Sequence, residues 1–143
     1  MSFKLFDLDY VVVGSANYFK KNNSPKRISE LIDHQCLSLL LNQFHSVWKF
    51  KKEGKTQSVK IDSKLKVTGA LSLIEYAKQG TGITLLPRKL IEKELKTGQL
   101  VQVLKSFEAT PTDFGSAAWL VYPSKDHLPA RTRAFVDFIK SQF

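Results

Sequence analysis

One segment, residues 67–87, constrains the fold more than any other part of this 143-residue chain. It carries a short apolar strand, a helical stretch, a glycine pair at Gly80 and Gly82, a second apolar strand and Pro87. Leu71, Ile74 and Ala77 recur at helical spacing, and Gly80 can adopt the left-handed conformation that ends a helix. Pro87 is predicted to open the next helix, where a missing N–H costs nothing. This strand–helix–strand–helix order predicts an α/β fold whose sheet is mixed but mostly parallel and flanked by helices.

Turn and alternation signals place further elements on both sides of this segment. Ser15 is a good N-cap for a short helix. A hairpin is predicted over residues 47–61 with its turn at Glu53-Gly54, and Gly98 is expected to stop a helix over residues 87–96. Strands are predicted over residues 6–13, 36–41, 100–104 and 116–122, with a short helix over 28–32, a loop over 107–114 and a final helix over 130–142. The strand over residues 116–122 is so apolar that we expect it to be buried on both faces.

The excess of basic residues can be read in two ways, as a nucleic-acid-binding surface or as an ordinary solvated surface. The chain has 22 Lys and Arg against 13 Asp and Glu, a net charge of +9. Such an excess is typical of nucleic-acid-binding proteins, so a basic nucleic-acid-binding module is one alternative. In the densest basic piece, residues 49–55, lysines alternate with apolar residues, as on the solvated face of a hairpin. This pattern favours ordinary solvent-exposed lysines over a dedicated phosphate-binding surface.

Candidate catalytic and metal-binding groups are sparse. The single cysteine, Cys36, lies in an apolar strand and is expected to be an inert core thiol. His34, His45 and His127 have no metal-ligand spacing. Gly80 and Gly82 follow a helix and precede a strand, the reverse of a dinucleotide-binding loop. We therefore expect no enzyme activity, no catalytic residue, no metal and no cofactor. The longest N-terminal apolar run is too short for a signal peptide or a membrane span, so a cytoplasmic protein is expected.

Binding is the remaining class of function. Ser15, the pair Leu41-Asn42 and the turn Thr68-Gly69-Ala70 all follow predicted strand ends. In open α/β sheets ligands collect outside the carboxyl ends of strands, and a helix N-terminus offers backbone N–H donors. Ser15 and Thr68 can equally be ordinary helix caps, and both readings stay open.

A family resemblance runs over nearly the whole chain. It rests on residues 10–19, 28–31, 34–37, 48–50, 82–87, 98–104 and above all 119–138, which contain Tyr122-Pro-Ser-Lys-Asp-His127. Together these residues resemble the C-terminal, effector-binding (substrate-binding) region of a LysR-type transcriptional regulator.

The resemblance implies a periplasmic-binding-protein-like type II fold, in which two Rossmann-like subdomains are joined by two crossover strands and enclose a small-molecule effector. It makes the chain, residues 1–143, a single partial effector-binding domain, with crossovers at 6–13 and 117–122, the second subdomain at 14–115 and a C-terminal helix at 130–142. The N-terminal helix-turn-helix and most of the first subdomain are expected to be missing, so that DNA would be bound only through that missing part. The effector is expected to be a small anion or carboxylate, held by Ser15, Leu41, Asn42, Thr68, Gly69 and Ala70.

The last helix carries an apolar stripe that the missing subdomain would otherwise cover. Leaving a large apolar side chain exposed forgoes roughly 1.5 to 3 kcal/mol of burial free energy. We therefore expect this stripe to pack back on its own subdomain or against a second copy in a homodimer. Its members are Phe135, Val136, Ile139 and Phe143.

Overall fold

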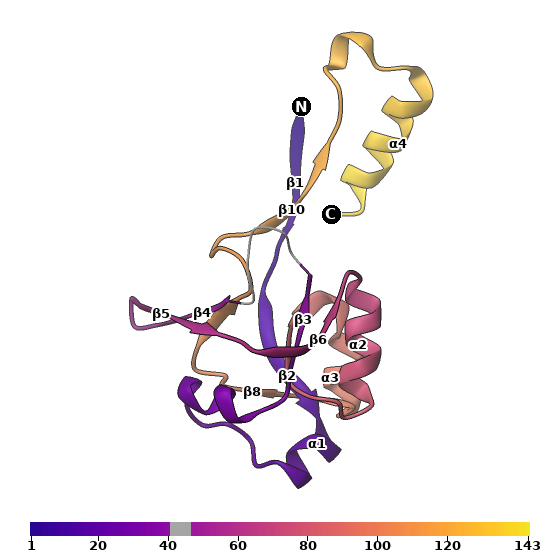
Figure 1. The fold of residues 1–143 in the computed structure, drawn as a ribbon. Helices are drawn as coiled ribbons and strands as arrows, with labels where there is room; N and C mark the ends of the chain where they lie inside the picture. The colour runs from indigo at the N-terminus through magenta and orange to yellow at the C-terminus, as the bar shows by residue number, and fades with distance from the viewer. Residues whose placement is uncertain (41–46) are drawn as a thin grey trace. The chain divides into compact units, whose positions relative to one another are not determined.

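A computed structural model describes residues 1–40 and 47–143 of the chain. The predicted site residues Leu41 and Asn42, together with His45, lie outside the described residues. The chain forms two compact units, shown in Figure 1: the first combines Met1–Leu8 with Gly115–Phe143, and the second is Asp9–Phe114.

The second unit contains most of the elements. Its strands are β2 (Tyr10–Ser15), β3 (Cys36–Leu39), β4 (Val47–Lys52), β5 (Lys55–Lys60), β6 (Ser63–Val67), β7 (Thr84–Pro87), β8 (Leu100–Val103) and β9 (Glu108–Thr110). Its helices are α1 (Ala16–Lys21), α2 (Ala70–Lys78), α3 (Glu92–Thr97) and the 3₁₀ helices η1 (Ile28–Asp33) and η2 (Arg88–Leu90).

Strand β2 is the centre of this unit. It pairs antiparallel with β7 on one edge and with β8 and β9 on the other. Val11 and Val13 enter a core shared with α2, whereas Val12 enters a second core with Trp48 and Phe50. Because successive strand residues point to opposite faces, the three valines are buried on both sides of the strand.

The sheet is mixed, but it contains less parallel pairing than the sequence predicts. Among the described residues, the parallel contacts are those of β3 with β6 and a bridge between Cys36 and Ile83. The N–H of Leu37 donates to the carbonyl of Ile83 at 2.8 Å, which joins β3 to the start of β7. The strand–helix–strand segment is therefore parallel to β3, as predicted. Strand β2 is antiparallel to β7, and the other described strand pairs are also antiparallel.

The segment that most constrains the fold forms the expected strand, helix and strand. Gly80 has φ of 80°, and Thr81 N–H donates to the carbonyl of Tyr76 at 3.3 Å, as at a left-handed helix end. Leu73, Ile74 and Ala77 are buried, and α2 packs across β2, β3, β6 and β7. Two details differ from the prediction: Leu71 is 76% exposed, and Pro87 ends β7 instead of opening a helix, since it pairs with Tyr10.

Other elements differ from the predictions where pairing with strands distant in sequence determines the local structure. The strand predicted over residues 6–13 is broken, because β1 (Ser2–Asp7) ends before β2 begins and the units divide between Leu8 and Asp9. The loop predicted over residues 107–114 contains β9, which pairs with β4 and β2. The hairpin β4–β5 and the helix stop at Gly98, which has φ of 78°, are confirmed.

The first unit is a two-stranded ribbon with one helix. Strand β1 pairs antiparallel with β10 (Ala117–Val121), and α4 (Ala130–Ser141) follows the 3₁₀ helix η3 (Lys125–His127). Lys140 Nζ donates to Tyr122 Oη at 2.8 Å and lies over the Phe3 ring, and Phe143 contacts Phe6 with ring centroids 5.4 Å apart.

The prediction that the last strand is buried on both faces is wrong. Trp119 is 54% exposed and Val121 is 75% exposed. In the described residues this ribbon has no further strand. Lys140 of α4 lies over the Phe3 and Tyr122 rings, whereas Trp119 and Val121 stay in solvent.

Gly82 provides a test of the packing between β3 and β7. A Cβ at this residue would meet the Gln35 carbonyl oxygen and would lie 3.0 Å from the Gln35 carbonyl carbon, both backbone atoms. We expect Gly82→Ala to lower the free energy of unfolding by about 1–3 kcal/mol, measured by urea denaturation. Gly69→Ala is the matched control, because a Cβ there meets only Ser72 Oγ at 4.0 Å. Equal stability of the two variants would contradict this packing.

Candidate functional site

The candidate site lies at one end of the second unit's sheet, the edge at which β3, β6 and β7 terminate. Leu39 at the end of β3 pairs with Val67 at the end of β6, and Tyr10 pairs with Pro87 at the end of β7. This edge therefore collects the carboxyl ends of three strands, the start of β2 and the start of α2. The chain enters this unit at Asp9 and leaves it at Phe114.

The N-terminal turn of α2 has no cap from a side chain. Its N-cap is Gly69 in extended conformation (φ −116°, ψ 135°), so Thr68 is not the cap. The Leu73 N–H donates to the Gly69 carbonyl at 3.3 Å, and no acidic residue lies in the first turn. Backbone N–H groups at such a turn carry partial positive charge and suit an anionic acceptor.

Ser15 does not join this site. It pairs with Leu100 at the opposite edge of the sheet, because β2 runs antiparallel to β7. Its Oγ accepts a hydrogen bond from the Tyr18 N–H at 3.0 Å, so Ser15 is the N-cap of α1. A Cβ on Gly80, just beyond the far end of α2, would lie 3.2 Å from Ser15 Oγ. The expectation that Ser15 gathers with Thr68 is wrong, since α2 separates them.

Sequence reasoning missed a polar pair at the site edge. Arg88 Nε contacts Asp9 Oδ2 at 3.0 Å, and its Nη2 donates to Gln102 Oε1 at 3.3 Å. The Arg88 N–H also donates to the Asp9 carbonyl at 2.8 Å, which fixes β2 to the end of β7. Asp9 and Arg88 are far apart in sequence, so only strand pairing brings them together. This exposed ion pair contributes little to the free energy of unfolding, but it places the Arg88 guanidinium near the end of β7.

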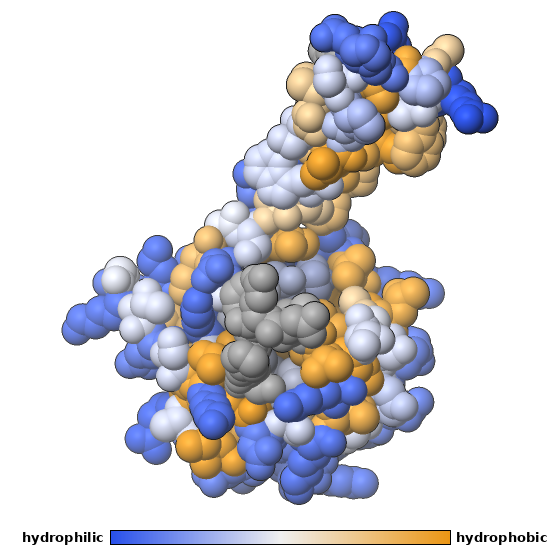
Figure 2. All heavy atoms as spheres, turned by 45° about the horizontal axis from the view of Figure 1, so that its top comes forward, coloured by the Kyte–Doolittle hydropathy of each residue, from blue (hydrophilic) through white to orange (hydrophobic). Residues whose placement is uncertain are grey.

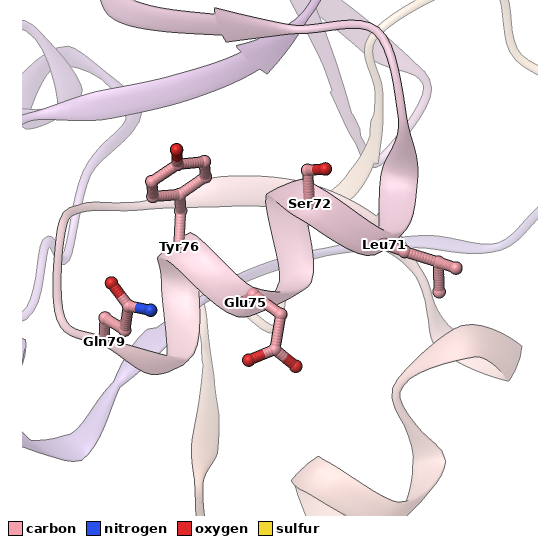
Figure 3. A pocket seen from close by; sticks show the side chains of 5 residues that line it. All are labelled: Leu71, Ser72, Glu75, Tyr76 and Gln79. Carbon is pink, nitrogen blue, oxygen red and sulfur yellow. The ribbon is translucent and has the colours of Figure 1, made fainter.

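The outer side of α2 carries a wide surface hollow of about 560 Å³. Figure 3 shows the side chains that line it, all from this helix and its C-cap: Leu71, Ser72, Glu75, Tyr76 and Gln79. Tyr76 is 39% exposed, and this face points away from the core formed by Leu73 and Ala77. The hollow mixes apolar and polar groups and contains no cluster of catalytic side chains.

Two groups with redox or acid–base potential are structural. Burial raises the pKa of the Cys36 thiol to about 12, and its Sγ lies 3.7 Å from the Leu31 carbonyl. Tyr18 Oη lies 2.7 Å from His34 Nδ1 and accepts from the Gln35 N–H at 3.3 Å. Burial raises the Tyr18 pKa, an effect that the Gln35 hydrogen bond opposes. His34 therefore helps to fix the buried Tyr18 ring.

Within the described residues, no group of three or more His, Cys, Asp and Glu is placed to hold a metal ion. No helix in the same residues is long and apolar enough to cross a membrane. Figure 2 shows hydrophilic and hydrophobic side chains interspersed on the surface that it presents.

The mixed α/β unit, with a helix N-terminus at the carboxyl ends of its strands, has the organisation of a periplasmic-binding-protein-like fold. The sequence model of the LysR substrate binding domain matches residues 2–143, and the chain belongs to this family. Its relatives are transcriptional regulators and not enzymes.

The named relatives are longer than this chain. It is 30% identical over 136 residues to the HTH-type transcriptional regulator PgrR of Escherichia coli K12, covering 94% of this chain and 44% of that protein. It is 28% identical over 135 residues to the probable HTH-type transcriptional regulator LtrA of Klebsiella pneumoniae, covering 94% and 43%. The full-length structure of the virulence activator AphB of Vibrio cholerae shares the fold, with a TM-score of 0.85 at 24% identity over 99% of this chain and 47% of that one. The chain thus spans less than half the length of these relatives.

The buried thiol gives a pH prediction. Because burial favours the neutral form of Cys36, the folded thiol stays protonated until about pH 12. In the unfolded chain the thiol has its ordinary pKa of 9.0, so this contribution to stability is full below pH 9 and declines above it. We expect Ellman's reagent at pH 8 to label Cys36 only at the rate of unfolding, measured by absorbance with and without urea. Immediate labelling of the native protein would contradict the burial.

Proposed function

We propose that these residues are the effector-sensing part of a LysR-type regulator and that the N-terminal turn of α2 is one wall of the effector site. The observation that carries the proposal is the uncapped start of α2 at Gly69, at the edge where β3, β6 and β7 end. Because Gly69 has no side chain, and a Cβ there would meet only Ser72 Oγ at 4.0 Å, a ligand atom can approach the Ala70 N–H closely.

The proposed effector is a small anion, such as a carboxylate. A helix N-terminus attracts negative charge, and α2 has no acidic residue in its first turn that would already serve that purpose. The Thr68 hydroxyl follows β6 directly and is proposed as a second donor. Leu41 and Asn42, which lie outside the described residues, remain predicted members of the site from sequence alone.

The two units fit the subdomain interpretation with shifted boundaries. We assign Asp9–Phe114 to the second subdomain, and β1 and β10 to the two crossover strands. Helix α4 is then the helix that returns to the first subdomain. In a regulator of this kind DNA is contacted by residues outside the matched segment, and effector sensing takes place in the cytoplasm.

Gly69→Asp tests the ligand site directly. The new carboxylate would cap α2 and occupy the place of the anion, so we expect stability to rise by about 0.3–1 kcal/mol and ligand-induced stabilisation to disappear. The measurement is a thermal-shift screen of the 143-residue chain with dicarboxylates and aromatic carboxylates, with the matching uncharged amides beside them. Gly69→Ala is the control for added size alone and should keep more of the ligand response than Gly69→Asp, because its Cβ adds no charge. A Gly69→Asp protein that responds like wild type would exclude this site.

We further propose that the exposed side of α4 forms an oligomer contact. Phe135 and Phe138 are each 59% exposed and lie three residues apart on the helix. Of the predicted stripe, Val136 is only 4% exposed and is therefore not available for this contact. Phe143 contacts Phe6 within its own unit but remains 57% exposed, and Ile139 is half-buried. The proposed self-association surface therefore centres on Phe135 and Phe138 and keeps Phe143 of the predicted stripe.

Replacing both aromatic residues, Phe135→Ser with Phe138→Ser, is expected to shift the protein toward the monomer. Each ring removed from an interface would forgo about 1.5–3 kcal/mol of burial. Sedimentation velocity over a range of protein concentrations measures the change, with Leu90→Ser as the control at an exposed apolar residue of the other unit. A wild-type protein that is monomeric at every concentration would remove the proposal.

A further inference from the structure

Strand β5 has one edge without a neighbour. The sheet runs in the order β5–β4–β9–β2–β7, and among the described strands none lies beyond β5. The hairpin turn at Glu53 and Gly54 has φ of 51° and 77°, the geometry of a two-residue turn whose flanking residues Lys52 and Lys55 form a hydrogen-bonded pair. Hydrogen-bonded and non-hydrogen-bonded pairs alternate along such a hairpin. The backbone N–H and C=O groups of Thr56, Ser58 and Lys60 therefore point away from β4.

This edge is strongly basic. The hairpin has one acidic residue, Glu53, against five lysines: Lys49, Lys51, Lys52, Lys55 and Lys60. Three of these are engaged nearby, since Lys49 pairs with Asp113, Lys51 lies over the Phe114 ring and Lys52 lies over the Phe107 ring. Lys55 and Lys60, at the two ends of β5, form no ion pair within the described residues.

A hollow of about 300 Å³ borders the same edge. Phe50 and Phe107 line it edge to face, with ring centroids 6.2 Å apart, and Lys52, Glu53, Lys55 and Gln57 of the hairpin complete its lining. A side chain of a strand placed beside β5 would lie next to Gln57 and could enter it.

We propose that β5 accepts an extended acidic segment of a partner protein as an added antiparallel or parallel strand. Main-chain hydrogen bonds to Thr56, Ser58 and Lys60 would supply affinity, and acidic side chains beside Lys55 and Lys60 would supply selectivity. The same lysines disfavour pairing of β5 with a second copy of itself, because such pairing would bring the lysines of both copies onto one short ribbon. Charge complementarity therefore selects an acidic occupant.

The observations favour a peptide over nucleic acid. Phe50 is 1% exposed and Phe107 already lies beneath Lys52, so neither ring offers a stacking platform for a base. The unused features of the edge are backbone groups in strand geometry, which a peptide matches and a phosphate backbone does not.

The test is fluorescence anisotropy with a labelled peptide of glutamate and threonine residues whose glutamates lie on both faces of the extended strand, because Lys55 and Lys60 point to opposite faces of β5. The peptide is added to the full 143-residue chain. Ser58→Pro removes an outward N–H while leaving the pairing with β4 intact, and is expected to weaken binding at least about tenfold. Ser58→Ala keeps that N–H and should bind as wild type. Lys55→Glu with Lys60→Glu should weaken binding by about tenfold or more, and the corresponding lysine–threonine peptide should not bind.

A second readout covers the case in which Ser58→Pro does not fold. Hydrogen exchange of the wild-type protein should show new protection of the Ser58 and Lys60 amides when the acidic peptide is present. The proposal is overturned by absence of saturable peptide binding, by unchanged binding in a folded Ser58→Pro protein, or by duplex DNA that binds more tightly than the peptide and is indifferent to Ser58→Pro.

Discussion

The pairing of β2 on both of its edges is the interaction on which the larger unit depends. Its hydrogen bonds to β7 join it to the parallel segment, and those to β8 and β9 join it to the hairpin side. Val11 and Val13 on one face and Val12 on the other link two separate cores. Because β2 runs against β7, it also decides which chain ends share an edge, and thereby which residues can form one site.

Features that depend on neighbouring residues could be predicted from the sequence. The left-handed φ at Gly80 and Gly98, the hairpin turn at Glu53-Gly54 and the cap at Ser15 are all present. Each follows from a local constraint: a missing Cβ, a short loop between alternating strands, or a hydroxyl within reach of the next turn. The start of α2, the candidate site, belongs to the same group.

Features that depend on distant partners could not be predicted in this way. Because β2 is antiparallel to β7, Ser15 lies at the opposite end of the sheet from the start of α2. Its local role as an N-cap was predicted. Pro87 fits a helix start by its own chemistry, yet pairing with Tyr10 keeps it in a strand. The apolar composition of β10 suggested burial on both faces, but exposure of Trp119 depends on how many layers cover the ribbon.

The two helices that follow strands in the larger unit begin differently, and this contrast bears on function. α1 begins at Ser15, whose Oγ occupies the Tyr18 N–H, whereas α2 begins at Gly69 without a side-chain cap. Glycine at an N-cap costs only a few tenths of a kcal/mol relative to serine, so α2 keeps its amide donors available with little loss of stability. Its other end is held by the Gly80 turn and its buried face by Leu73 and Ala77. The helix start is thus open to the proposed ligand, while the rest of the helix is fixed against the sheet.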